Sequence, residues 1–272
     1  MNSRFGYIPR DSLIHRLNPS MKLFSLVLLM TGILIYPSWI LSGTILILLV
    51  LTFKASRVPI RLASNRVRFL ILFSLILLLF QVILAQNGTI LAYFIPRIGE
   101  VGPFLPITDF GLARGLSISI RFLAIVFSSM LFVSVTDPTL LAHSFTKLRI
   151  PYRYSFALVI ALRFLPLFDT ETNQVRMAQK SRGISIEVGG SRKILRSIRY
   201  TFFPLLVSAL SRVDTLSLSM DGRGFGYQSE RTYLRTTSWT KSDFLVMASS
   251  ILFVLLCIVL TLGYLPQISS IL

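Results

Sequence analysis

A run of 31 residues without a charged side chain, from Leu23 to Phe53, constrains this chain more than any other feature. As one straight helix the run would be about 46 Å long, whereas the hydrocarbon core of a bilayer is about 30 Å thick. Pro37 interrupts the run, because proline has no backbone N–H to donate and biases the preceding residue, Tyr36, away from helical geometry. The run therefore predicts two membrane-crossing helices, over residues 19–36 and 38–55, with almost no loop between them.

Three further apolar segments predict three more crossings. The third helix is expected over residues 69–86, the fourth from about Asp109 to about Val135, and the fifth over residues 244–264. Residues that favour helix ends flank the five segments. In chain order these are Asn18 with Pro19, Ser38, Asn87-Gly88, Thr108-Asp109, Thr136-Asp137-Pro138 and Ser242-Asp243. The predicted fold class is an all-α integral membrane protein with about five transmembrane helices and long amphipathic cytoplasmic helices.

Composition supports the membrane assignment, and charge predicts the orientation. Charged residues make up 14% of the chain, against about 25% in soluble domains. Lys and Arg number four in residues 1–22, five in 54–68, one in 87–111 and none in 265–272. The positive-inside rule therefore places the N-terminus, the 54–68 loop and residues 137–243 in the cytoplasm, and the C-terminus outside. A cleaved signal peptide is the competing interpretation, but no A-x-A-like site occurs and a second apolar helix follows directly.

Other features exclude several kinds of site. The net charge of +17 does not indicate nucleic-acid binding, because long uncharged runs separate the arginines. A single cysteine, Cys257, excludes an internal disulfide, and His15 and His143 are too isolated to suggest a metal centre, so no metal or cofactor is expected. The predicted domains, in chain order, are four membrane helices in residues 1–136, a cytoplasmic region in 137–243, and the last membrane helix with an external C-terminus in 244–272.

The cytoplasmic region, residues 137–243, holds 16 of the 28 Lys and Arg and 8 of the 11 acids, so function is sought there. Residues 152–168 form an apolar stretch that is expected to end around Pro166 and to continue as a polar helix over 169–182. From Ile194 to Val213 apolar residues recur at three- and four-residue steps, and basic residues fall on another face. We expect the two helices to pack on each other, half buried, at the cytoplasmic interface.

Each of these helices ends in a small-Arg-small signature, Ser181-Arg182-Gly183 in the first and Gly222-Arg223-Gly224 in the second. Glycine ends a helix by adopting a left-handed turn, and the helix dipole favours a cation near the C-terminus. Small neighbours also leave the planar guanidinium free to enter a carboxylate-lined pocket on another protein. Ordinary capping with a solvated arginine is the alternative. A phosphate-binding loop is excluded, because these glycines follow a helix and no Gly-Lys-Ser/Thr sequence occurs.

Two further pairs of charged residues are candidates. Arg121 lies about 18 Å along the fourth helix from Asp109 and shares a face with Arg114. Charge inside a membrane indicates function, so both arginines are candidate subunit contacts. The alternative is that Arg121 snorkels or bonds a neighbouring helix carbonyl. Asp169 and Glu171 resemble an acid pair for catalysis, but we expect them on a solvated helix face.

Several short motifs occur in an order that is typical of one protein family. They are Tyr7-Ile8-Pro9, Ser12-Leu13-Ile14-His15-Arg16-Leu17-Asn18-Pro19, Thr136-Asp137-Pro138, Leu148-Arg149-Ile150-Pro151, Leu162-Arg163-Phe164-Leu165-Pro166, Glu171 and the two arginine signatures. Over nearly its whole length the chain resembles the transmembrane coupling subunit of energy-coupling factor (ECF) transporters, the EcfT or CbiQ-like family. The family's signature usually begins with alanine, where this chain has Ser181 and Gly222. Both residues are small, although Gly222 is expected to end the second helix earlier.

The resemblance implies a non-catalytic subunit of an ATP-driven importer. Its partners would be two ATP-binding-cassette (ABC) ATPases, identical or different, docked on Arg182 and Arg223, and a separate substrate-binding membrane subunit (S component). The substrate would be a vitamin, a vitamin precursor or a transition-metal ion. A membrane enzyme acting on anionic lipid headgroups is the alternative, but the cytoplasmic region lacks a nucleophile or metal set for it. A channel or self-contained carrier would need polar residues facing one another across several spans.

Overall fold

The computed structural model describes residues 7–56, 64–85, 87–95, 104–148, 150–184, 198–227 and 239–263. The chain divides into two compact units. The first unit comprises Met1–Ser144 and Thr237–Leu272, and the second comprises Phe145–Thr236.

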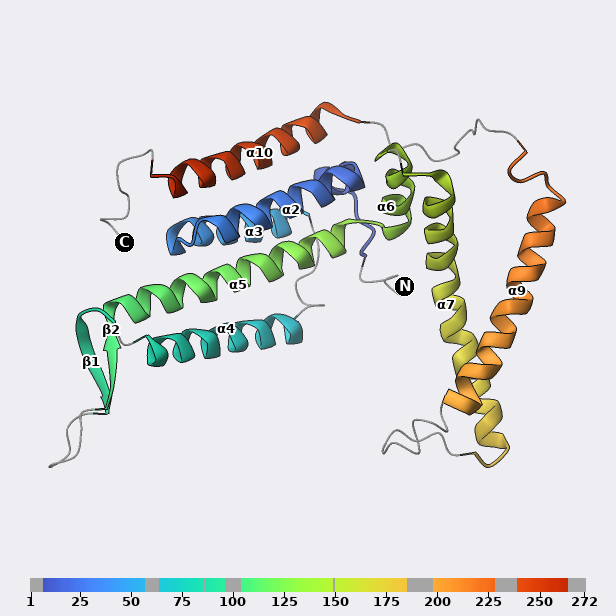
Figure 1. Ribbon diagram of the computed structural model, residues 1–272, viewed down its shortest axis with the longest axis horizontal. Helices are drawn as coiled ribbons and strands as arrows, with labels where there is room; N and C mark the ends of the chain where they lie inside the picture. The colour runs from blue at the N-terminus through green and yellow to red at the C-terminus, as the bar shows by residue number, and fades with distance from the viewer. Residues whose placement is uncertain are drawn as a thin grey trace. The chain divides into compact units, whose positions relative to one another are not determined.

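The first unit consists mainly of apolar helices that lie side by side (Figure 1). Its elements are α1 (Leu13–Arg16), α2 (Pro19–Ile35), α3 (Trp39–Ala55), α4 (Ser64–Leu84), β1 (Ile90–Ile95), β2 (Phe104–Thr108), α5 (Asp109–Val135), α6 (Pro138–Ser144) and α10 (Lys241–Thr261). Helices α4, α5 and α10 are long and apolar enough to cross a membrane, while α2 and α3 are apolar helices of 17 residues each. The first unit therefore has the composition of a multi-pass membrane protein.

The ends of α2 and α3 follow the residues predicted to form them. The Asn18 side chain accepts a hydrogen bond from the backbone N–H of Ser20 (3.3 Å), and Pro19 occupies the first helical position. The two helices lie on either side of Pro37, which confirms the predicted break. Ser38 is the N-cap residue of α3, but its side chain makes no capping hydrogen bond.

Helix α5 also has its predicted bounds, and Thr108 caps it through its side chain. Helix α10 begins differently from the prediction that Ser242-Asp243 caps it. The cap is Thr240, and Asp243 occupies the third helical position, where the two residues satisfy each other's backbone N–H groups in a capping box. The cap lies at Thr240 and not at Ser242-Asp243 because a Thr-x-x-acid sequence places the acid inside the first turn of the helix.

A two-stranded hairpin precedes α5. The strands β1 and β2 are antiparallel, with Ile90 opposite Thr108 and Ile95 opposite Phe104. Isoleucine, tyrosine and phenylalanine in β1 are residue types that favour strands. The fold is thus predominantly helical, with one small sheet that the helical prediction does not include.

Helix α5 is the central helix of the first unit, because it packs against α2, α3 and α4. Ser74 of α4 and Ser119 of α5 each donate a hydroxyl hydrogen bond to the other's backbone carbonyl, at 3.3 Å and 3.1 Å. Paired in this way, the two buried hydroxyls avoid the free-energy cost of unsatisfied polar groups. Phe53 of α3 meets Phe127 of α5 edge-on, with 6.3 Å between ring centroids. Helix α10 packs against α2.

The second unit is built on two long helices. Its elements are η3 (Phe145–Leu148), α7 (Tyr152–Ser181), η4 (Ile198–Phe202) and α9 (Phe203–Asp221). Helix α7 is continuous over 30 residues and passes through Pro166, so the prediction that its apolar part continues as a polar helix to about Arg182 is confirmed. Proline removes one backbone donor, and the remaining turns on both sides continue the helix. The predicted beginning of the second helix at Ile194 lies outside the described residues, which resume at Ile198.

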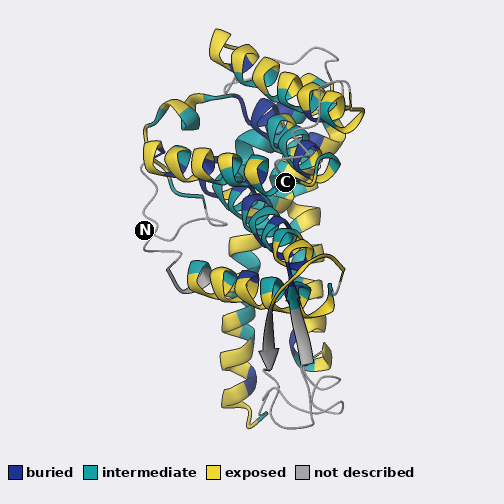
Figure 2. Ribbon diagram, turned by 90° about the vertical axis from the view of Figure 1, so that its left-hand side faces the viewer, coloured by how far each residue is buried: buried dark blue, intermediate teal, exposed yellow. Residues whose placement is uncertain are grey.

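The expected half-buried character of α9 is found only in part. Leu205 and Ala209 are partly covered, but no residue of α9 is buried. Val207, Leu210 and Val213 are exposed, because α7 packs against α9 without enclosing its apolar residues. Figure 2 shows exposed residues along the helices of the chain. Extended exposed apolar surface of this kind indicates contact with another molecule or with lipid.

Candidate functional site

The first arginine signature forms the C-terminal end of α7. Arg182 is the C-cap residue, and Gly183 follows with a φ of 75°. The N–H of Ile184 donates to the carbonyl of Gln179 (3.0 Å), and the N–H of Gly183 donates to the carbonyl of Lys180 (3.0 Å). This pair of bonds is a Schellman motif, in which glycine supplies the left-handed residue at low cost. The motif fixes the backbone that carries the exposed Arg182 side chain.

The second signature repeats this geometry after α9. Gly224 has a φ of 69°, the N–H of Phe225 donates to the carbonyl of Met220 (3.0 Å), and the N–H of Gly224 donates to the carbonyl of Asp221 (3.0 Å). Regular helix stops at Asp221, two residues before Arg223, whereas α7 continues to the residue before its arginine. The expectation that Gly222 ends the second helix earlier is therefore confirmed. Both arginines nevertheless occupy the position directly before the left-handed glycine.

Small neighbours leave both guanidinium groups accessible. A Cβ atom added to Gly183 or Gly224 would meet no other atom within 4 Å. The Ser181 hydroxyl turns back to donate to the carbonyl of Met177 (3.1 Å), so it does not cover the arginine. Within the described parts of the chain, neither arginine makes an ion pair or a side-chain hydrogen bond. Each helix end thus presents a complete set of guanidinium donors.

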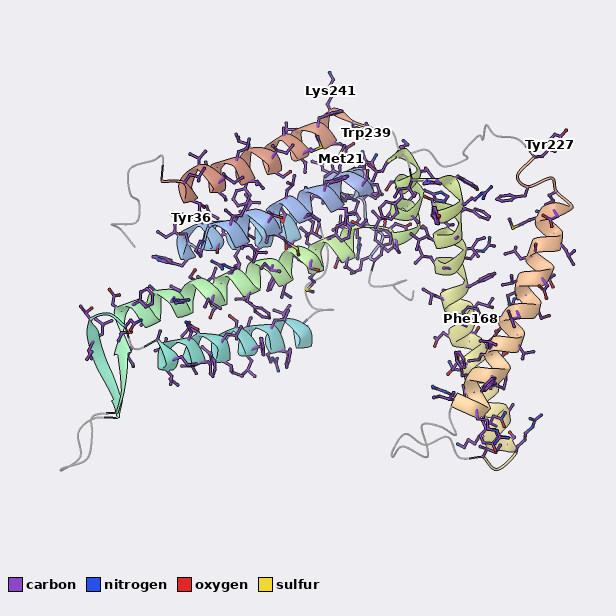
Figure 3. The ribbon with its side chains drawn as sticks, in the orientation of Figure 1. Met21, Tyr36, Phe168, Tyr227, Trp239 and Lys241 are labelled. Carbon is purple, nitrogen blue, oxygen red and sulfur yellow. The ribbon has the colours of Figure 1, made fainter. Side chains whose placement is uncertain are left out.

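The two signatures lie at opposite ends of one helix pair. The Phe225 ring, after the second signature, packs on Phe156 near the beginning of α7, with 4.7 Å between centroids. At the other end, the Gln179 side chain donates to the carbonyl of Tyr200 in η4 (3.2 Å). The antiparallel course of α7 and α9 is visible in Figure 1, and Tyr227 marks the far end of α9 in Figure 3. From Phe156 to Arg182 the helix extends about 39 Å, so the arginines form two separate sites.

Between these ends, Glu171 of α7 and Arg212 of α9 form an ion pair. Ser208 of α9 donates a second hydrogen bond to the Glu171 carboxylate (3.2 Å). The Glu171 side chain is only 13% exposed, so its expected position on a solvated face is wrong. Asp169, in contrast, is exposed. Asp169 and Glu171 therefore have different roles, and Glu171 joins α7 to α9 midway along the pair. The sequence did not predict this role, because Arg212 lies 41 residues from Glu171.

Arg114 and Arg121 belong to the first unit and differ in their surroundings. Arg114 is exposed, and its guanidinium lies 5.7 Å from the centroid of the Phe110 ring. Two nitrogens of Arg121, Nε and one Nη, are buried without a hydrogen-bond partner among the described residues. The alternative of a bond to a helix carbonyl is therefore not found for these two nitrogens.

Sequence reasoning also missed a buried charged cluster at the N-terminal end of α2. Lys22 is 8% exposed and Asp243 of α10 is fully buried. A signal was present, since a lysine in the first turn of a helix opposes the helix dipole and needs a compensating group. In Figure 3, Met21 and Trp239 mark this end of α2 and α10. No group of three or more potential metal ligands occurs among the described residues.

A family model described as CbiQ, cobalt transport protein, matches residues 10–234. The chain belongs to the CbiQ family. Its curated relatives include the energy-coupling factor transporter transmembrane protein EcfT of Leuconostoc gelidum, 31% identical over 265 residues, or 93% of this chain and 95% of the relative. The EcfT protein of Exiguobacterium sibiricum is 32% identical over 216 residues, covering 74% of this chain and 78% of the relative.

The EcfT protein of Bacillus subtilis is 28% identical over 256 residues, which cover 90% of this chain and 92% of the relative. The similarity extends through both units, because the CbiQ match begins before α2 and ends after α9. These relatives confirm the family resemblance and identify the chain as a multi-pass membrane component of transport. They give no support to a lipid-modifying enzyme.

Proposed function

We propose that this chain is the transmembrane coupling subunit of an ECF-type ABC importer, and that Arg182 and Arg223 each dock one ATPase. The observation that carries the proposal is the repeated geometry of the two helix ends. Each presents an exposed arginine before a left-handed glycine, and the two stand at opposite ends of one helix pair. Two equivalent, widely separated contacts suit two ATPase subunits, whether identical or different, better than one small ligand.

Each arginine would enter a carboxylate-containing pocket on its ATPase. Guanidinium binds carboxylate through two parallel hydrogen bonds, which fixes orientation as well as position. Exposed ion pairs contribute only about 0–1 kcal/mol, whereas losing one partner of a desolvated interfacial pair costs about 2–5 kcal/mol. The arginines therefore act as anchors only when the complex buries them. Ser181, Gly183, Gly222 and Gly224 keep the approach to the two guanidinium groups open.

Transport in this proposal requires no catalytic residue in the chain itself, because the ATPases hydrolyse ATP. The chain converts their approach and separation into a change in how α7 crosses α9. Coupling requires contacts that differ between the two states. The ion pair between Glu171 and Arg212 lies between the anchored ends, so a change in how α7 crosses α9 would alter the distance between these two side chains. Residues 137–243 are thus the coupling-helix region of the proposed domain arrangement.

The membrane part of the proposal comprises residues 1–136 and 244–272. We assign five helices as transmembrane segments: α4, α5 and α10, which are long and apolar enough to cross a membrane, and the shorter apolar helices α2 and α3. The distribution of Lys and Arg supports a cytoplasmic N-terminus, a cytoplasmic coupling region and an external C-terminus in the cell membrane.

The remaining partner is an S component that binds a vitamin, a vitamin precursor or a metal ion. Exposed apolar side chains of α9, among them Val207, Leu210 and Val213, supply surface for such a membrane protein or for lipid. We propose Arg121 and the exposed Arg114 as a further subunit contact, because two buried nitrogens of Arg121 have no partner among the described residues.

The test is to replace both arginines and ask whether the ATPases still co-purify. We expect Arg182→Ala with Arg223→Ala to abolish ATPase attachment or substrate uptake while the chain still inserts into the membrane. Arg176→Ala is the matched control, because Arg176 is an exposed arginine of α7 outside the signatures. Normal co-purification together with normal uptake by the double variant would refute the proposal.

A further inference from the structure

The chain passes from the first unit into the second after Ser144 and returns at Thr237. Helix α5 precedes the first of these connections, and α10 follows the second. The last residue of α5 and the first turn of α10 are both bonded to residues at the N-terminal end of α2. Four groups make these bonds: the Asn18 N–H, the Lys22 ammonium, the Val135 carbonyl and the Asp243 carboxylate. Thr240 holds the Asp243 carboxylate, and we call these five groups together the α2 clamp.

Lys22 holds the end of α5. Its Nζ donates to the backbone carbonyl of Val135 (3.2 Å) and to the carbonyl of His15 (3.1 Å). Val135 is the last residue of α5, so its carbonyl has no partner within the helix. A cation is also the favoured group at a helix C-terminus. Val135 is 2% exposed, so little water can replace the ammonium there.

Asp243 holds the beginning of α10 against α2. One carboxylate oxygen accepts the backbone N–H of Asn18 (2.8 Å), which is the N-cap residue of α2. The other oxygen accepts the N–H (2.8 Å) and the hydroxyl (2.7 Å) of Thr240. Asp243 is fully buried and Asn18 is 3% exposed. Buried charges with this many specific partners tolerate few alternative arrangements.

We propose that Lys22 and Asp243 are positioning residues for transport, which make α5 and α10 move with α2 as one body when the second unit is displaced. Without the α2 clamp, a pull on either connection would shift one helix past its neighbour instead of moving the membrane helices together. The inference rests on the proposed coupling function, because it presumes that ATP binding displaces the second unit.

The experiment measures one distance in the complex purified with its ATPases. Nitroxide labels are placed at Lys54→Cys, at the end of α3, and Leu245→Cys, in α10, in a Cys257→Ala background. Lys54 is exposed and Leu245 is 71% exposed, and neither belongs to the clamp. Because α3 packs against α5, the label at position 54 follows α5. Pulsed electron paramagnetic resonance then measures the distance between the two nitroxides in the nucleotide-free complex and in the complex bound to a non-hydrolysable ATP analogue.

With the clamp intact, we expect the same distance in both nucleotide states. In Lys22→Met and in the isosteric Asp243→Asn, the distance should change on analogue binding by more than about 2 Å, the scale of helix shifts at interfaces. The ATPases should still co-purify with both variants. Arg16→Met and Asp109→Asn are the matched controls, because both residues are exposed and lie at helix ends.

An unchanged distance in both clamp variants, or an equal change in the unsubstituted complex, would overturn the inference. Loss of the assembled complex in both variants would also overturn it, because the clamp would then serve folding alone. If the unsubstituted chain fails to co-purify with ATPases, it is the proposed function that fails.

Discussion

Replacing Gly224 by alanine should weaken ATPase docking through the backbone alone. Gly224 has a φ of 69°, and an added Cβ would meet no atom within 4 Å, so a methyl group fits sterically with its surroundings. The free-energy cost of the substitution comes only from the left-handed backbone conformation, which is unfavourable for an L-residue by about 1–2 kcal/mol. If the bound complex requires the Schellman geometry that holds Arg223, that free energy lowers the affinity by about fivefold to thirtyfold.

The assay is a titration of detergent-solubilised chain with its ATPase subunits. Gly224→Asn should bind within about twofold of the unsubstituted chain, because asparagine tolerates the left-handed conformation far better than alanine. Gly183→Ala should behave like Gly224→Ala, since Gly183 has a φ of 75° and equally open surroundings. Gly43→Ala in α3 is the control, because its added Cβ also meets nothing within 4 Å but its φ is ordinary. Equal affinities for the alanine and asparagine variants would refute the reasoning.

Two further predictions concern stability. Glu171→Gln should lower the free energy of unfolding by no more than about 1 kcal/mol, seen as a lower melting temperature, because Arg212 is 41% exposed and solvent screens the pair. Asp169→Asn, at an exposed residue, should leave the melting temperature unchanged. Equal effects of the two substitutions would contradict the role of Glu171 at the crossing of α7 and α9. Burial lowers the pKa of His15 below its ordinary value of 6.5, and the charge of Lys22 lowers it further. The hydrogen bond to the Ile8 carbonyl and the charge of Asp11 raise the pKa, but they do not outweigh burial. The unfolded chain therefore binds more protons below pH 6.5, so stability should fall as the pH falls through that range, and His15→Gln should remove part of this fall in thermal melts.

Local signals in the sequence predicted much of the fold. The break at Pro37, the Asn18 cap and the bounds of α5 follow from short-range chemistry, because each depends on a few neighbouring residues. The continuation of α7 past Pro166 was also predicted, because helix-forming residues lie on both sides of the proline. The burial of Glu171 could not be predicted this way, because it depends on Arg212, which is distant in sequence.

The same distinction between local and long-range interactions applies to the candidate site. Both helix ends at Arg182 and Arg223 were predictable, because a small-Arg-small sequence carries its own backbone geometry. Their separation to opposite ends of the pair was not, because it depends on how α7 meets α9. The α2 clamp was predictable only in part. Lys22 in the first turn of a helix indicates a compensating group, but only the packing of α2 against α10 brings Asp243 to this end of α2.

Photo-crosslinking from positions next to the two arginines, in native membranes, tests the central claim most directly. A photoreactive amino acid replaces the exposed Lys180 in one variant and the exposed Tyr227 in another, so that both arginines stay in place, with the exposed Asp169 as the control position. The docking proposal predicts that positions 180 and 227 each form a covalent adduct with an ATPase subunit, and that position 169 does not. Adducts with lipid alone at positions 180 and 227, or no adducts at all, would contradict it.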